Sequence, residues 1–255
     1  MAALLSAPVS VHAQIPEVIP IFPLEVTMLF PGVSRPLHIF EPRYRAMVAD
    51  ALKGDRIIGM TTLKPGFEGN YEGRPPIYEI GCAGLITDVE ELPGGRFNIE
   101  LRCVTKFRVT GEDDSRPYRL ARVDAVAEEL DETERAALHK HRLHLEELIT
   151  KGSDSKVEPE TTDEQLVNTV AQYLPLGHAE RQGLLELKSP LVRVRALIEL
   201  IESKGARPRL AAGGLSDKRR LPRSAGTSDQ RVVLAELTAN PFRDVLKGDG
   251  LRTAP

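Results

Sequence analysis

The sequence contains no tryptophan and only two cysteines, and aromatic residues make up 5% of its 255 residues. No segment approaches the roughly 18 uninterrupted apolar residues that a membrane-spanning helix needs, so no membrane span is predicted. Cys82 and Cys103 lie in strand-like segments without a Cys-x-x-Cys pair, which predicts ordinary buried thiols in a reducing compartment, with a disulfide as the less favoured alternative. The 41% apolar content still suffices for a sizeable core.

Histidines and paired acids form no catalytic or metal-binding pattern. His139, His141 and His144 are close in sequence, but offsets of two and five do not bring three rings onto one helical face, so a solvated face is expected. The acidic pairs fall beside predicted turns or strand ends, where solvated surface charge is expected. These pairs are Glu90-Glu91, Asp113-Asp114 and Glu128-Glu129. We predict no catalytic residue, no metal site and no cofactor.

Charge is divided unevenly along the chain. From Gly205 onward, ten Lys and Arg stand against five Asp and Glu, a net charge of +5, so the whole-chain value of −3 leaves −8 for the first 204 residues. An acidic body repels phosphate backbones and attracts cationic partners. Residues 205–255 carry Pro, Gly, Ser and scattered Arg without periodicity, which predicts a disordered basic tail.

The first 14 residues predict a disordered leader. They end in a small-residue pattern like a signal-peptidase site but lack a basic start and a long apolar core, so export is the less favoured alternative to a cytoplasmic location.

An apolar run with two prolines opens the folded region. Pro20 and Pro23 lack the N–H that a central strand donates, so residues 19–24 are expected at a sheet edge or at a strand entry that bends. A second apolar stretch, residues 37–40, breaks at Glu41-Pro42 into a helical pattern, and Pro42 suits the first turn of a helix. A strand is therefore predicted to lead directly into an amphipathic helix.

This order of residues resembles the LON substrate-binding domain, the N-terminal module of the ATP-dependent protease Lon, which also occurs as free-standing bacterial proteins. The resemblance covers nearly all of residues 17–204 and implies a PUA-like β-pseudobarrel followed by a helical subdomain. One departure is Cys103, where such domains usually carry Gly, and this puts a backbone bulge there in question. Further matching segments are Gly59-Met60 and residues 78–86, 106–109, 173–176 and 180–186.

Residues 15–127 are predicted to form the barrel. Residues 96–103 alternate strictly between apolar and polar side chains, as a half-buried strand does, and Pro93-Gly94-Gly95 supplies a hairpin turn to the strand over 84–92. Several short strands at this spacing, with one early helix, favour a small closed or partly open barrel in an α+β fold. Further strands are predicted at residues 56–63, 106–110 and 118–126.

Residues 128–204 are predicted to form a four-helix subdomain. Asp131 with Glu134 and Thr162 with Gln165 each have the spacing of a helix start, and Ser189-Pro190 precedes a last apolar-faced helix. A short helix is expected between them at residues 178–187.

Large apolar side chains in predicted loops are the candidate peptide-binding residues: Met28, Phe30, Phe67 and Tyr71. Exposed apolar residues on loops mark binding surfaces, although anchoring of these loops to the core is an equal alternative.

The resemblance implies a non-catalytic module that recognises unfolded or degron-bearing polypeptides, with a separate protease or chaperone as a further partner. The sequence contains no Walker A loop, Gly-x-x-x-x-Gly-Lys-Ser/Thr, and leaves no room for a proteolytic domain with an activated serine. The alternative is an RNA-binding module, since PUA-like folds also bind RNA. The acidic body and the lack of a basic-aromatic stripe disfavour nucleic acid as a partner.

Overall fold

The computed structural model describes residues 15–25, 27–67, 73–151 and 157–203. The predicted leader, the basic tail and Tyr71 lie outside the described residues. The strands are β1 (Val18–Leu24), β2 (Ser34–Ile39), β3 (Ile57–Thr62), β4 (Ile80–Leu92), β5 (Arg96–Asp113) and β6 (Arg119–Val126). The helices are α1 (Pro42–Ala51), α2 (Glu132–Thr150), α3 (Asp163–Tyr173), α4 (His178–Glu186) and α5 (Pro190–Ser203).

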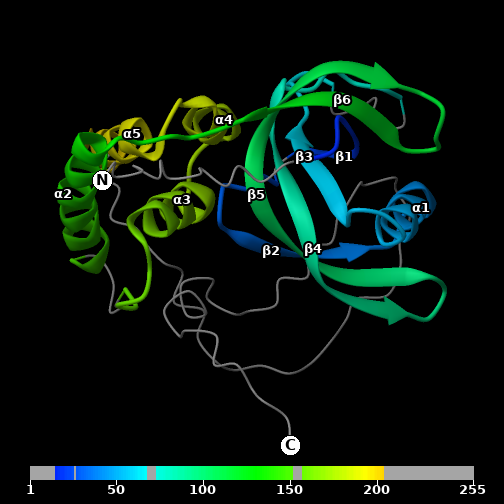
Figure 1. Ribbon diagram of the computed structural model, residues 1–255, viewed down its shortest axis with the longest axis horizontal. Helices are drawn as coiled ribbons and strands as arrows, with labels where there is room; N and C mark the ends of the chain where they lie inside the picture. The colour runs from blue at the N-terminus through cyan, green and yellow to red at the C-terminus, as the bar shows by residue number, and fades with distance from the viewer. Residues whose placement is uncertain (1–14, 26, 68–72, 152–156, 204–255) are drawn as a thin grey trace, which may run out of the picture.

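The six strands close into a barrel, which confirms the predicted α+β class (Figure 1). Their order is β2-β5-β4-β3-β1-β6, and a further pairing of β5 with β6 completes the ring. One edge of β5 is shared by two strands, because residues 97–102 pair with β2 and residues 106–113 pair with β6. This shared edge faces the helical half of the molecule and positions the candidate site described below.

The prolines of β1 do not place it at the sheet edge, and this expectation was wrong. β1 pairs with β6 through Val18–Ile21 and with β3 through Ile21–Leu24, so its two partners succeed one another. Pro20 precedes the pairing with β3, and Pro23 follows the pairing with β6. Each proline can therefore lack its N–H without breaking a ladder hydrogen bond.

Strand β5 is continuous over 18 residues, where the sequence predicted two separate strands. Its register against β4 shifts between Ala83 and Gly84, which face Thr105 and Cys103 respectively, so Val104 is an extra residue in β5. This is a β-bulge. The bulge is present although Cys103 stands where the resemblance led us to expect glycine, because the extra residue is Val104, one position later.

Cys82 and Cys103 form a disulfide between β4 and β5, which corrects the prediction of two free thiols. Their Cα atoms are 5.8 Å apart, within the usual range for a bridged pair, and both residues are buried. Sequence spacing did not show the pairing, because only the hairpin register brings the two positions together.

Two hydrophobic cores fill the molecule. The barrel core receives α1, whose Tyr44, Met47 and Val48 are buried at 0–4% exposure at the end away from the other helices (Figure 1). The helical core lies among α2, α3, α4 and α5 and includes four residues from the barrel half of the chain: Met28, Phe30, Val33 and Ile80. The helices therefore complete their core with side chains supplied by the barrel.

The predicted helix starts are confirmed in atomic detail. Asp131 accepts from the backbone N–H of Glu134 at 2.7 Å, and Thr162 accepts from that of Gln165 at 3.2 Å, with a reciprocal side-chain contact in each case. Such boxes satisfy backbone donors that a helix start leaves unpaired. No helix among the described residues has the length and apolarity to cross a membrane.

Candidate functional site

A groove of about 630 Å³ lies where the barrel meets the helices. It opens at the point on β5 where β2 has ended and β6 has not yet begun, beside the bulge at Val104. The barrel, the segment after β6 and helix α3 supply its walls. The lining residues are Pro31, Gly32, Val104, Thr105, Lys106, Val126, Ala127, Glu128, Glu129, Leu130, Arg135, Thr162, Glu164, Gln165, Asn168 and Pro190.

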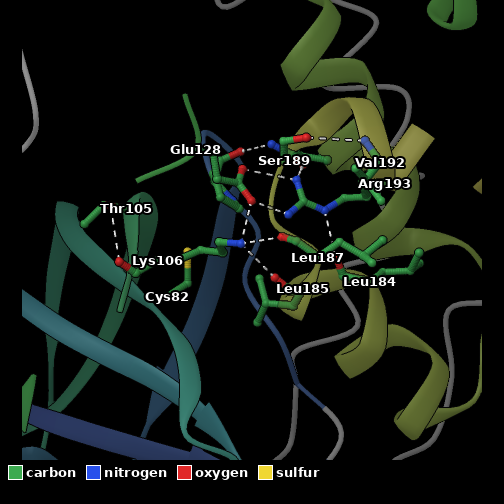
Figure 2. Close-up of polar contacts among 12 residues, drawn as sticks. Cys82, Thr105, Lys106, Glu128, Leu184, Leu185, Leu187, Ser189, Val192 and Arg193 are labelled. Atoms are coloured by element: carbon green, nitrogen blue, oxygen red, sulfur yellow. Dashed lines mark hydrogen bonds and ion pairs between the residues drawn. The ribbon is translucent and has the colours of Figure 1, made fainter. Parts of the chain in front are cut away.

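Lys106 forms the base of the groove and fastens the barrel to the helices (Figure 2). Its side chain is 1% exposed, and its ammonium donates to the carbonyls of Leu185 and Leu187, at 3.1 and 2.6 Å, where α4 ends. The third contact of the ammonium is Glu128 Oε1 at 2.7 Å. All three donors of the ammonium are thus directed to partners, as burial of a charge requires.

Arg193 of α5 contacts the same carboxylate from the helical side (Figure 2). Its guanidinium, fully buried, donates to both oxygens of Glu128, to Leu184 O at 2.9 Å and to Asn168 Oδ1 at 2.6 Å. The guanidinium carbon also lies 5.5 Å from the ring centre of Phe30. One carboxylate from the connecting segment therefore bridges a barrel cation and a helix cation.

The buried network changes the interpretation of one acidic pair. Glu128 was expected at the surface, but its side chain is only 11% exposed. Burial lowers the pKa of Lys106 from its usual value, and the nearby Glu128 carboxylate opposes that shift. Because Glu128 stands between two buried cations, its negative charge is what makes their burial tolerable.

The lining of the groove combines apolar and polar side chains. Its described lining contains no serine, cysteine or histidine, and the buried Lys106 is held by two carbonyls and a carboxylate. The edge of β5 is uncovered only at half-buried Val104 and Thr105, because Gly32 and Val33 bond to the backbone of Cys103 and the pairing with β6 begins at Lys106. Backbone edges and mixed apolar and polar walls are typical of sites that hold extended polypeptide.

Two of the predicted peptide-binding residues are buried instead of exposed. Met28 is 2% exposed and Phe30 is 0% exposed, because both complete the helical core beneath α3 and α5. The structure therefore gives them the alternative role of core anchors and corrects the expectation of exposed loop side chains.

Phe67 is the exposed member of the predicted set, at 40% exposure, and it lies in the loop after β3. Tyr71 lies outside the described residues. Peptide binding by this loop stays a prediction. Met28 and Phe30 belong to the helical core, of which Phe67 is not a member.

The three histidines of α2 make separate contacts. His139 lies 3.0 Å from Asp163, His144 lies 3.0 Å from Glu202, and His141 accepts from Arg195 at 3.2 Å. Burial, and next the charge of Arg195, lowers the pKa of His141. Among the described residues, no group of three His, Cys, Asp or Glu side chains has the arrangement of a metal site.

Sequence reasoning missed the three charged residues of the network. Glu128, Lys106 and Arg193 are far apart in the chain, and only the closing of the barrel against α5 unites them. No local signal was available, because a lysine beside an apolar residue in a strand points to the opposite face and is ordinarily exposed.

Comparison with known proteins agrees with this architecture. The family model for the ATP-dependent protease La (LON) substrate-binding domain matches residues 18–203. "Lon protease 2" of Myxococcus xanthus is 26% identical over 74% of this chain, and "Lon protease" of Anaeromyxobacter dehalogenans is 24% identical over 80%. The chain spans 24% and 25% of the lengths of these two relatives.

A solved structure shares the fold. The "N terminal domain of Mycobacterium avium complex Lon protease" aligns with a TM-score of 0.54 and 18% identity, covering 72% of this chain and 98% of that one. At this identity the likeness concerns the fold alone.

Proposed function

The chain belongs to the ATP-dependent protease La (LON) substrate-binding domain family, and we propose that it binds unfolded or degron-bearing polypeptides without cutting them. The observation that carries the proposal is the match of the family model over residues 18–203. A separate protease or chaperone would act on the polypeptide that is held.

The groove beside the β5 bulge is the part of the described surface that fits this function best. It is the size of sites that hold small segments, since binding pockets commonly measure a few hundred to about 1,000 Å³. An extended segment lying there would meet the short uncovered edge of β5 at Val104 and Thr105 on one side and α3 on the other. Strand addition at such an edge supplies backbone hydrogen bonds that do not depend on the bound sequence, as a receptor for varied polypeptides requires.

A matched pair of substitutions in β5 tests the groove. Val104 and Val109 are both half-buried on the barrel, but only Val104 lines the groove. We expect Val104→Glu to weaken binding of a labelled hydrophobic peptide at least tenfold, because it places a charge where apolar contact is lost, a cost of about 1–2 kcal/mol. Val109→Glu should leave affinity unchanged while costing similar stability in a thermal melt.

The Phe67 loop provides the competing location. If Phe67→Ser abolishes peptide binding and Val104→Glu does not, the polypeptide site is the loop after β3 and the groove assignment is wrong. Fluorescence anisotropy with the same peptide measures all three variants.

Salt distinguishes polypeptide from RNA. Binding through apolar contacts should change little when salt rises, whereas each phosphate contact of RNA makes affinity fall steeply with salt. Titrations with the hydrophobic peptide and with a single-stranded RNA, at low and high salt, are expected to give salt-tolerant peptide binding. Tight, salt-sensitive RNA binding without peptide affinity would contradict the proposal, as would ATP-dependent cleavage of casein by the purified protein.

A further inference from the structure

A second group of cations gathers at the other end of α3. Arg35 of β2 places its guanidinium carbon 5.7 Å from the ring centre of Tyr173, the last residue of α3. Arg181 of α4 donates through one terminal nitrogen to the carbonyls of Leu174 and Leu176, at 3.1 and 3.3 Å, just beyond that helix end. The two guanidinium groups therefore approach the same turn from opposite sides.

The inner nitrogens of this cluster have no partner. Arg35 Nε, Arg181 Nε and His178 Nε2 are each shielded from solvent, and none makes a hydrogen bond. Buried N–H donors are nearly always satisfied, so two guanidinium nitrogens without a partner at the same helix end are candidates for binding a ligand. The ring nitrogen of His178 donates or accepts according to its tautomer. A terminal nitrogen of Arg181 makes the contacts with the helix-end carbonyls, and these contacts explain the position of the side chain. Its Nε makes no hydrogen bond.

The two arginines of the cluster have no ion-pair partner among the described residues. Within the described ranges, no carboxylate lies within 4.0 Å of Arg35 or Arg181. Burial lowers the pKa of Arg181, and the neighbouring Arg35 lowers it further. Burial also lowers the pKa of Arg35, where the charge interaction and the hydrogen bond with Tyr173 oppose the shift. Burial likewise lowers the pKa of His178, with Arg181 adding to the shift and Glu25 opposing it. Cations that are disfavoured both by burial and by a neighbouring cation are common at functional sites.

We propose that Arg35, Arg181 and His178 form a binding site for an oxyanion, and that its ligand is a carboxylate of the bound polypeptide. A guanidinium group offers donors in a plane that matches two carboxylate oxygens, and two such groups would complete the set that is orphaned here. Inorganic phosphate has the same chemistry and serves as a probe. The assignment of a polypeptide carboxylate rests on the proposed function, whereas the anion site itself does not.

The anion site is tested on the full chain with inorganic phosphate. Phosphate should raise the melting temperature above that in chloride at equal ionic strength, because a ligand of the folded state stabilises it. Arg35→Gln and Arg181→Gln should each remove this increment. Arg116→Gln, which removes the same charge from the opposite side of the barrel beside Asp50, is the matched control and should retain it. Equal phosphate responses in all four proteins overturn the site.

The polypeptide ligand is tested with a pair of labelled hydrophobic peptides that differ only in Glu against Gln at one position. The wild type and Arg116→Gln should prefer the Glu peptide roughly tenfold, the range expected for a hydrogen bond to a charged group. Arg35→Gln and Arg181→Gln should bind both peptides equally, at the affinity of the Gln peptide.

The outcomes separate the two proposals. Peptide binding by the wild type without any Glu preference overturns the carboxylate assignment and leaves polypeptide binding intact. If neither peptide binds, the proposed function and the polypeptide carboxylate both fail, while the phosphate melts still decide the anion site. Arg181→Gln also removes hydrogen bonds at the end of α3, so Arg35→Gln, which removes none of these, decides the result if Arg181→Gln does not fold.

Discussion

The barrel and the helical half close their hydrophobic cores in different ways. The barrel core is drawn from the six strands, α1 and the loops that join them, and a ring of backbone pairing surrounds it. The helical core contains Met28, Phe30, Val33 and Ile80 from the other half of the chain. The barrel is therefore self-contained, whereas the helices depend on the barrel for part of their interior.

Hydrogen bonds between buried polar groups connect the barrel to the helical half. Phe30 donates its backbone N–H to Gln172 of α3 at 3.0 Å, and Gln182 of α4 donates to Ile80 O at 3.1 Å. These bonds and the carboxylate of Glu128 join the halves at defined points. The groove therefore exists only when the barrel and the helices pack together, because neither half alone supplies both of its walls.

The largest effect is expected from separating the halves. A fragment of residues 15–127 should keep a cooperative thermal transition and the circular dichroism of a sheet, because its core is complete. A fragment of residues 128–203 should lose cooperative unfolding, because its core lacks four apolar side chains. A cooperative melt of the helical fragment alone would show that the comparison is wrong.

Glu128→Gln should give the next largest effect. It leaves the buried ammonium of Lys106 and guanidinium of Arg193 without a counter-charge, and breaking a buried pair in this way costs about 3–5 kcal/mol. Urea unfolding measures the loss.

Glu91→Gln, the same change at an exposed site in the β4–β5 hairpin, is the matched control and should cost no more than about 0.5 kcal/mol. Equal stabilities for the two variants would mean that Glu128 does not hold the halves together.

Reduction of the disulfide should destabilise the barrel. The bridge joins positions 21 residues apart, and the chain-entropy relation for a loop of this size gives about 3 kcal/mol. Denaturant unfolding with and without reductant measures the difference, and Cys82→Ala/Cys103→Ala removes its dependence on reductant. Reactive thiols in the unfolded, unreduced protein would show that the bridge is absent.

The smallest effect concerns the attachment of α1 to the barrel at alkaline pH. Burial, and next the hydrogen bond to Asp50 at 2.8 Å, raises the pKa of Tyr118 to about 12. An unfolded tyrosine ionises near its usual pKa of about 10, so the unfolded state releases this proton first and stability falls as the pH rises from 10 toward 12.

In urea titrations at several pH values, the free energy of unfolding of Tyr118→Phe should fall less with rising alkaline pH than that of the wild type. Tyr78→Phe is the control on the same barrel, and it should keep the full slope. An unchanged slope in Tyr118→Phe would show that the hydrogen bond to Asp50 does not set the alkaline stability.

The fold was predictable where a local rule fixes the backbone. Pro42 at the first turn of α1 and the capping boxes at Asp131 and Thr162 were predicted because each depends on residues within one turn of a helix. Of the two placements predicted for residues 19–24, the sheet edge was wrong, because β1 has a strand on each side and each of these strands covers only part of its length. β6 and β3 pair with successive parts of β1, and each proline lies where the strand on one side of β1 is absent.

The candidate sites were largely beyond prediction. Met28 and Phe30 are apolar residues in a loop, and nothing local shows whether such a loop faces solvent or a neighbouring helix. The family match left the location of binding open for the same reason, since the groove exists only between β5 and α3.

The sequence by itself determined the strand and helix periodicity, the helix starts and the family, because these depend on neighbouring residues and on the order of motifs. Only the tertiary structure decided that Cys82 bonds to Cys103, that Glu128 neutralises two buried cations, and that Arg35 and Arg181 both lie at the end of α3. Each of these relations joins residues distant in the chain, and the free energy of a charge or a thiol is set by the groups that surround it in space.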